Sequence, residues 1–255
     1  MTPAQALCAG FAVALVGLLA AAPADAAGCS FEPQGEGRVA AVIDARTFRL
    51  TDGREIRLLG IEPVAGTGRA ALAAIIAGRE VTLSGDDDSP DRYGRQPAFV
   101  HLAGAATPVQ GTLIAQGEAL VAADVADRGC AATLLAAEAE ARRARRGTWA
   151  DPAAIKNAES PGDILTGIGR FTVVEGRVLS VRQAGATTYV NFGRNWTRDF
   201  AVTISRRAAA AHEAAGIRLK SLENRRIRVR GWVGARGGPR IEVLRVGQIE
   251  VLGGN

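Results

Sequence analysis

The chain has 255 residues, with 31 Lys+Arg, 26 Asp+Glu and a formal net charge of +5, and 47% of its residues are hydrophobic. This composition excludes a disordered, collagen-like or disulfide-dense protein, and the length predicts one large or two small globular domains. The charge is uneven, because residues 27–155 sum to −3 and residues 156–255 sum to +9. The second half is therefore the part expected to face a polyanion.

The N-terminal 26 residues have the features of an export signal. The apolar run from Phe11 to Ala22 is shorter than the roughly 20 residues that cross a bilayer as a helix. It ends in Ala24-Asp25-Ala26, a cleavage site of small residues. We expect a signal peptide at 1–26 and an exported chain, periplasmic or secreted, without stable membrane insertion after cleavage. A retained anchor and lipidation at Cys29 are the alternatives.

Cysteine usage agrees with export. Cys8 leaves with the signal, and Cys29 and Cys130 remain as an even pair for an oxidising compartment. We predict a Cys29–Cys130 disulfide, with two free thiols as the alternative. No CxxC pair or His/Cys cluster is present, so zinc is not expected.

Hydrophobic periodicity divides the mature chain into two domains, 27–155 and 165–255, joined by a polar linker at 156–164. In the first domain, the predicted strands are 37–44, 47–50, 54–59, 80–83 and 97–102, and the predicted helices are 69–77, 109–116 and 131–146. Asp52-Gly53 is expected to form the hairpin turn between the second and third strands. This order predicts a small closed barrel with helical cover.

The second domain has the strand and helix order expected of an OB barrel. Strands are predicted at 171–181, 187–192 and 199–204, a helix at 207–215, and a hairpin that pairs 225–233 with 240–246 through Gly234 to Pro239. Glu36-Gly37-Arg38-Val39-x-x-Val42 recurs as Glu175-Gly176-Arg177-Val178-x-x-Val181, which indicates a shared architecture. The predicted fold is mainly β with helices (α+β), with two OB barrels in tandem.

Three motifs of the first domain occur in the order and spacing of one known family. They are Val42-Ile43-Asp44-x-x-Thr47, Arg57-Leu58-Leu59-Gly60-Ile61-Glu62 and Asp91-Arg92-Tyr93-Gly94-Arg95. With the closing Arg146-Gly147-Thr148-Trp149, they resemble the staphylococcal nuclease (thermonuclease) family over residues 36–150. The resemblance implies a first OB barrel of that type and calcium-dependent hydrolysis of DNA and RNA phosphodiesters. It also implies two phosphate-clamping arginines and a carboxylate that activates water.

The resemblance places the two catalytic arginines at Arg57 and Arg95, with Tyr93 and Arg46 nearby as nucleic-acid contacts. Two guanidinium groups that converge on one phosphate stabilise the charge on its equatorial oxygens. The alternative is that each arginine pairs with a surface carboxylate such as Asp44 or Asp91.

The carboxylates depart from the family pattern. The first metal loop, Asp-Gly-Asp-Thr in the family, reads Asp44-Ala45-Arg46-Thr47 here, so an arginine replaces a calcium ligand. The family's Asp-Thr-Pro-Glu corresponds to Glu62-Pro63-Val64-Ala65, which has no glutamate at the general-base position. Asp44 and Glu62 remain as candidate calcium ligands, and Glu62 as the candidate catalytic carboxylate. Calcium is implied by the family and disfavoured by this motif, because Arg46 would repel it.

Two other arrangements of this site stay open. Arg46 could replace the positive charge of the metal, in a calcium-free site with Glu62 as the base. Alternatively, Asp86-Asp87-Asp88 could bind a cation, although such a run is typical of a solvated loop.

The second domain contains its own pattern for nucleic-acid binding. The strand period of two puts Arg226, Arg228, Arg230 and Trp232 on one face, with the apolar residues between them facing the core. Tyr189 and Trp196 could add stacking platforms for bases. A solvated face and aromatic side chains packed into the barrel are the alternatives.

Together, these patterns predict an exported thermonuclease-family protein that binds DNA or RNA, as a single strand, through a degraded calcium and general-base site. Loss of a general base typically costs about 10²- to 10⁴-fold in rate, so cleavage is expected to be weak or absent. The alternatives are an active phosphodiesterase with an unconventional or metal-independent site, and an envelope module that binds protein or polysaccharide. No pattern in the sequence predicts the oligomeric state.

Overall fold

The computed structural model describes residues 29, 31–123, 125 and 127–253. The predicted signal peptide at 1–26 lies outside these residues. None of the described helices is long and apolar enough to span a bilayer.

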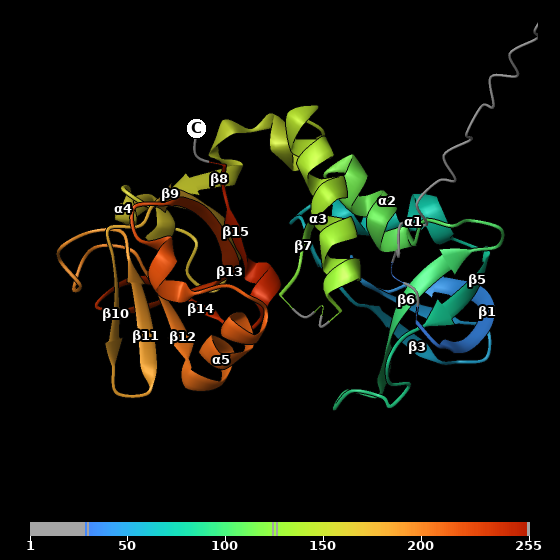
Figure 1. Cartoon of the computed structure of the whole chain (residues 1–255). Helices are drawn as coiled ribbons and strands as arrows, with labels where there is room; N and C mark the ends of the chain where they lie inside the picture. The colour runs from blue at the N-terminus through green and yellow to red at the C-terminus, as the bar shows by residue number, and fades with distance from the viewer. Residues whose placement is uncertain (1–28, 30, 124, 126, 254–255) are drawn as a thin grey trace, which may run out of the picture.

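Two groups of strands and helices lie side by side, each around its own apolar core (Figure 1). The first group contains β1 (Pro33–Val42), β2 (Thr47–Leu50), β3 (Glu55–Leu58), β4 (Ile61–Pro63), α1 (Gly68–Ile76), β5 (Glu80–Ser84), β6 (Arg95–Leu102), α2 (Val109–Gln116), β7 (Ala119–Val121) and α3 (Arg128–Arg143). The short 3₁₀ helices η1 (Gly147–Ala150) and η2 (Pro152–Ala154) follow. The predicted helices and strands of this half are thereby confirmed to within a few residues.

The first group forms a closed barrel in the order β1-β2-β3-β6-β5, with β5 pairing back to β1. All neighbouring strands are antiparallel except β3 and β6, which are parallel. Alternation along β2 and β3 buries Phe48, Leu50, Ile56 and Leu58 in the barrel core. The predicted Asp52-Gly53 turn joins these two strands. A glycine stands in it because residue 53 adopts a φ of 93°, a backbone conformation that favours glycine.

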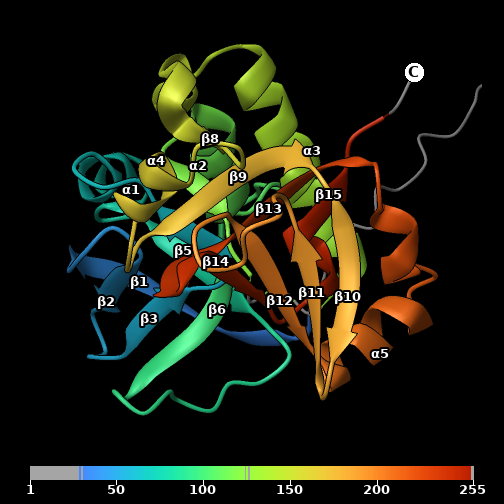
Figure 2. The ribbon, with the colours of Figure 1, turned by 90° about the vertical axis from the view of Figure 1, so that its left-hand side faces the viewer.

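The second group is one eight-stranded sheet with a few helices against it. Its elements are β8 (Ile155–Asn157), α4 (Pro161–Leu165), β9 (Phe171–Arg177), β10 (Ser180–Ala184), β11 (Thr187–Asn191), β12 (Ala201–Ser205), α5 (Arg206–Ala214), η3 (Leu219–Leu222), β13 (Arg226–Arg236), β14 (Gly238–Val243), η4 (Val246–Gln248) and β15 (Ile249–Val251). The strand order is β10-β11-β12-β14-β13-β9-β8, with β15 on β13. Figure 2 shows β10, β11 and β12 side by side, near α5.

The structure differs from the sequence prediction at the expected linker. Residues 156–164 contain most of β8, which pairs in parallel with β9, and the start of α4. Pro161 stands in the first turn of α4, where a proline has no hydrogen bond to lose. Pro161 therefore marks an element boundary within the packed second domain. The hairpin between β13 and β14 is also tighter than predicted, because it turns at Gly237.

The Glu-Gly-Arg-Val repeat occupies matching positions in the two sheets. Gly37 pairs with Val81 of β5, and Gly176 pairs with Ile227 of β13. A Cβ atom at Gly37 would lie 3.0 Å from Leu50, and one at Gly176 would lie 2.4 Å from Ala158 Cβ and 3.0 Å from Phe192. A side chain would therefore be crowded at both positions, most severely at Gly176.

A disulfide joins Cys29 to Cys130, across a sequence separation of 101 residues. Both cysteines are buried, and Cys130 lies in the first turn of α3, where its backbone N–H donates to Asp127 Oδ1 at 2.7 Å. The bond therefore fastens the start of the described chain to α3.

Replacing both cysteines with serine is expected to lower the free energy of unfolding by about 2–4 kcal/mol, because the unfolded chain loses a cross-link around a long loop. Urea unfolding of the double variant and of the oxidised parent measures this difference. The same loss should follow reduction of the parent by dithiothreitol. An unchanged midpoint under reduction would contradict the cross-link.

Candidate functional site

The turn between β1 and β2 places two of the predicted site residues, Asp44 and Arg46. Asp44 is exposed, and its Oδ1 accepts the backbone N–H of Arg46 at 2.8 Å. This contact is an Asx turn, in which the carboxylate stabilises its own loop. The Arg46 carbonyl accepts the N–H of Leu58 at 2.8 Å, so the turn is fixed to the end of β3.

Arg46 forms an ion pair with Glu62 at the mouth of the first barrel. Arg46 Nη1 lies 2.8 Å from Glu62 Oε1, and the two side chains are 25% and 13% exposed. Glu62 comes from β4, whose pairing with β7 fixes its position. The guanidinium thus occupies the place beside this carboxylate where a bound cation would otherwise sit.

The calcium implied by the family resemblance does not fit these side chains as they stand. Calcium takes six to eight oxygen ligands, whereas Asp44 is engaged with its own loop and Glu62 with a guanidinium. No group of three or more His, Cys, Asp or Glu side chains with metal-binding geometry occurs in the part of the chain that the structure describes. Asp86, Asp87 and Asp88 are exposed.

Arg57 and Arg95 project from the same face of neighbouring strands. In the parallel pairing of β3 with β6, Arg95 is opposite Glu55 and Arg57 is opposite Pro97, so the two arginines are diagonal neighbours. Arg95 pairs with Asp91 through Nε at 3.0 Å and Nη2 at 2.8 Å, both to Oδ2. The alternative of a carboxylate partner is thus confirmed for Arg95. Tyr93 is 65% exposed, with the guanidinium of Arg95 4.9 Å from its ring centroid.

The Asp91 carboxylate is strongly stabilised in its charged form. Partial burial acts to raise its pKa, but hydrogen bonds from the Arg95 side chain and from the backbone N–H groups of Tyr93 and Arg95 outweigh burial and lower the pKa to about 2. A lowered pKa means that the charged pair stabilises the fold above the unfolded value of 3.8, and that this stabilisation is lost as the pH falls towards 2.

Asp91→Asn is therefore expected to lower the free energy of unfolding by about 0.5–1 kcal/mol at pH 7, the range of a solvent-screened ion pair. The difference between variant and parent should shrink as the pH is lowered from 4 to 2. Urea unfolding at several pH values measures it. A difference that stays constant or grows on acidification would contradict the assigned pKa.

Arg57 and Glu62 line a cleft of about 710 Å³ between the two groups of strands. Three more arginines reach the same cleft from distant parts of the chain: Arg128 at the start of α3, Arg207 in the first turn of α5, and Arg245 before η4. Trp232 of β13 also lines it and is 53% exposed. No sequence motif contains Arg128, Arg207 or Arg245. Arg207 and Arg245 reach Arg57 only because the second sheet packs beside the barrel.

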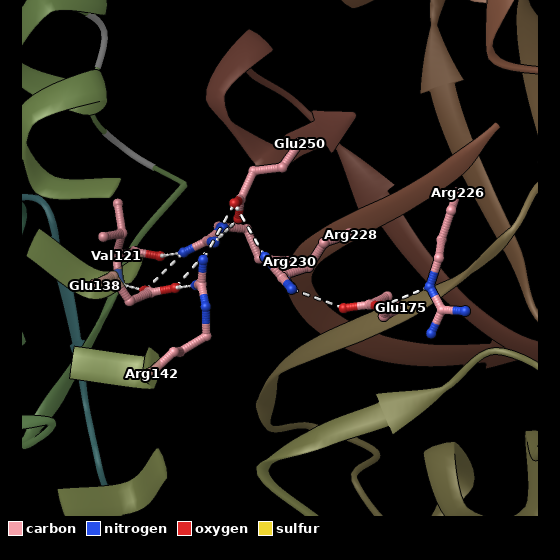
Figure 3. A network of polar contacts seen from close by, with 8 residues as sticks. All are labelled: Val121, Glu138, Arg142, Glu175, Arg226, Arg228, Arg230 and Glu250. Carbon is pink, nitrogen blue, oxygen red and sulfur yellow. Dashed lines mark hydrogen bonds and ion pairs between the residues drawn. The ribbon is translucent and has the colours of Figure 1, made fainter. Parts of the chain in front are cut away.

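The predicted arginine stripe on β13 lies on one face, as expected, but most of it is not available to a ligand. Arg226 is exposed, whereas Arg228 is 13% exposed in its side chain and Arg230 is fully buried. The expectation of an open basic surface is therefore wrong for Arg228 and Arg230. The physical reason is that α3 packs against this face with Glu138, and the neighbouring strand β15 adds Glu250 to it (Figure 3).

These arginines belong to a network of ion pairs across the boundary between the two groups of strands. Arg230 donates to Glu138 of α3 at 2.8 and 3.1 Å, to the Val121 carbonyl at 3.3 Å, and to Glu250. Burial acts to lower the pKa of Arg230, but Glu138 and Glu250 outweigh it and raise that pKa. Figure 3 shows that the network continues through Arg142 and Arg228 to Glu175 and Arg226.

The three aromatic residues of the second domain that were predicted to contact nucleic acid differ in exposure. Trp196 is 69% exposed and Trp232 is 53% exposed, whereas Tyr189 is partly buried on β11. Arg240 of β14 lies over the Tyr189 ring, 5.7 Å from its centroid. The ring of Trp232 meets Phe171 edge to face, with 6.1 Å between centroids. Trp196 and Trp232 thus present open ring surface to solvent, as stacking on a ligand requires.

Comparison with known proteins assigns the first domain. The family model described as "Staphylococcal nuclease homologue" matches residues 56–151, a range that contains Arg57, Glu62 and Arg95. A search of curated proteins gave no significant match. The first domain is therefore similar to the staphylococcal nuclease homologues over residues 56–151.

Proposed function

We propose that this protein binds nucleic acid in the cleft beside its nuclease-homologue domain and cleaves it weakly or not at all. The observation that carries the proposal is the ion pair between Arg46 Nη1 and Glu62 Oε1 at 2.8 Å. It places a fixed positive charge where the family uses a metal, and it engages the carboxylate that would serve the reaction. The loss of the general-base glutamate also lowers the expected rate of cleavage.

The charges of the cleft support binding of a phosphate polymer. Its walls hold Arg57, Arg128, Arg207 and Arg245, against Glu62, which pairs with Arg46, and Asp127, which caps α3. Guanidinium groups bind phosphate through two parallel hydrogen bonds, and several in one cleft can follow successive phosphates.

We also infer that both domains are OB barrels. The first barrel joins its strands in the order one, two, three, five, four, with α1 between the third and fourth. If β9 and β10 count as one strand interrupted at Val178 and Leu179, the second sheet follows the same order, with α5 in the same place. The third and fifth strands are parallel in both, as β3 with β6 and β12 with β14. The matching positions of Gly37 and Gly176 support this inference.

The proposed site of action is outside the cytoplasm, in the periplasm or the medium. The export features of residues 1–26 and the Cys29–Cys130 bond support this placement, because disulfides persist in oxidising compartments.

The binding test is fluorescence anisotropy with a 5′-labelled single-stranded oligonucleotide, in EDTA, from 50 to 200 mM salt. If the four cleft arginines contact phosphates, affinity should fall by about 50-fold over this range. Arg207→Ala should weaken binding, whereas Arg79→Ala should leave it unchanged, because Arg79 is exposed and does not line the cleft. An absence of binding at 50 mM salt, or equal effects of the two variants, would contradict the proposal.

A second candidate function, metal-independent phosphodiester hydrolysis, is favoured by one specific observation. Glu62 and Arg57 line the same cleft, and Arg46 contacts Glu62, so a carboxylate base and two guanidinium groups meet at one place. Cleavage that persists in EDTA and disappears in Glu62→Gln would support this function over binding alone.

A further inference from the structure

The cleft beside the nuclease-homologue domain does not end at that domain. A second cavity of about 600 Å³ shares Ala123, Ser205, Trp232 and Leu244 with the cleft. A third cavity, of about 460 Å³, shares Tyr189, Arg236 and Arg240 with the second. The three cavities therefore form one continuous groove, which runs from Arg57 past Trp232 and over the second sheet to Trp196.

Strand register explains why this groove lies on the polar face of the second sheet. Tyr189 is opposite Arg182 on β10 and Thr203 on β12, and Thr203 is opposite Glu242 on β14. Alternate residues of the same strands, including Val190, Val202 and Ile241, are buried in the core. Ala201, Thr203 and Gly234, which have small side chains or none, line this groove among the arginine and aromatic side chains.

The far end of the groove is strongly basic. Arg182, Arg236 and Arg240 line the third cavity, and no carboxylate occurs among its described lining residues. None of these three arginines forms an ion pair with a residue that the structure describes. They differ in this respect from Arg228 and Arg230, whose charges are neutralised inside the protein. The groove arginines are therefore available to an anionic ligand.

Aromatic rings recur along the same groove. Trp232 stands at the junction of the first two cavities, Tyr189 at the junction of the second and third, and Trp196 at the end. Aromatic rings beside guanidinium groups bind unpaired bases and their phosphates, whereas a duplex keeps its base faces stacked inside. We propose that this groove is a track for one strand of nucleic acid, which leaves the cleft and crosses the second domain. This inference rests on the proposed function, and it adds Arg182, Arg236 and Arg240 to the residues that bind nucleic acid.

The test uses the mature chain with its disulfide intact, 5′-fluorescein-labelled dT20, and a 20-base-pair duplex as the competing probe. Arg236→Ala/Arg240→Ala should weaken dT20 binding about tenfold or more at 50 mM salt. It should also lower the salt slope by about 1.4, since each phosphate contact to a single strand contributes about 0.7. Arg225→Ala is the matched control, because Arg225 is an exposed arginine of the same domain that lines none of the three cavities.

Trp196→Ala gives an independent measurement on a ring that is too exposed to support the fold. It should weaken dT20 binding about 5- to 150-fold, the range of one lost base stack, without changing the salt slope. Both groove variants should retain the circular dichroism spectrum of the parent.

The possible results separate this inference from the proposed function. If the parent binds dT20 and the groove variants bind it as the Arg225→Ala control does, the track is overturned and cleft binding stands. Duplex binding as tight as dT20 binding would also overturn the track, because the rings would then have no role. If the parent binds neither probe at 50 mM salt, both proposals fail together.

Discussion

Arg230→Ala is expected to lower the free energy of unfolding by about 3–5 kcal/mol, because it leaves a buried carboxylate without its main partner. Glu138 is 0% exposed and accepts both terminal nitrogens of Arg230, at 2.8 and 3.1 Å. The Val121 N–H and Arg142 remain as its other partners. They do not replace a two-pronged guanidinium contact across the boundary between the domains.

Urea unfolding followed by circular dichroism measures this effect. Arg226→Ala serves as the control, since the side chain of Arg226 is 68% exposed and its loss from Glu175 should cost less than about 1 kcal/mol. Arg230→Met/Glu138→Met should recover much of the stability, because it removes both buried charges. If Arg230→Ala lowers the free energy of unfolding by less than about 1 kcal/mol, this ion-pair network does not hold the two domains together as proposed.

Arg46→Asp is expected to raise calcium affinity about tenfold or more. The substitution replaces a guanidinium 2.8 Å from Glu62 with a carboxylate, in the loop that already holds Asp44. Removing one unit of repulsion close to a bound cation is worth about 1–4 kcal/mol, depending on screening, and the new carboxylate adds an oxygen ligand. Isothermal titration calorimetry with calcium chloride measures the change.

Arg49→Asp is the matched control, because Arg49 lies on β2 of the same barrel and pairs with Glu55, and neither residue lines the cleft. It makes the same change in charge and should leave calcium affinity unchanged. Arg46→Asp should still cleave poorly, since no general base has been restored, and addition of Ala65→Glu or Val64→Glu should raise the rate about 10²- to 10⁴-fold. Equal calcium affinities in parent and Arg46→Asp would show that Arg46 does not keep the metal out.

Most of the secondary structure could be predicted from the sequence, because it depends on local chemistry. Strand alternation, the Asp52-Gly53 turn and the glycines after helices determine the barrel strands and the helices of the first domain to within a few residues. The short strands β4, β7, β8 and β15 were missed, since each is only three residues long. Three residues carry too little periodicity to distinguish a strand from a loop.

The face of each residue on β13 was predictable, but its burial was not. The period of two separates Arg228 and Arg230 from Val229, as the structure shows. It does not reveal that Glu138, in an Ala-rich helix, and Glu250, near the chain end, cover that face. Arginines neutralised by distant carboxylates and arginines open to a ligand have the same local pattern.

Some residues of the candidate site could likewise be predicted from the sequence, and others could not. Arg57, Glu62 and Arg95 lie in a motif and could be found from sequence, as could the substitution of Arg46 for a ligand. Arg207 and Arg245 reach the cleft through the packing of one domain beside the other. The groove residues Arg236 and Arg240 are brought beside Tyr189 by strand pairing within the second sheet. The arginines of the second half thus have two different roles. Arg228 and Arg230 form ion pairs inside the protein, whereas Arg236 and Arg240 face the groove.

The most direct measurement follows the integrity of end-labelled single-stranded DNA incubated with the mature chain, with calcium and with EDTA, on a denaturing gel. The account predicts intact strands in both conditions, at protein concentrations where anisotropy shows the DNA to be bound. Calcium-dependent cleavage at a rate typical of an enzyme, abolished by Arg57→Ala, would contradict it, because the Arg46–Glu62 pair would then not have replaced the metal site.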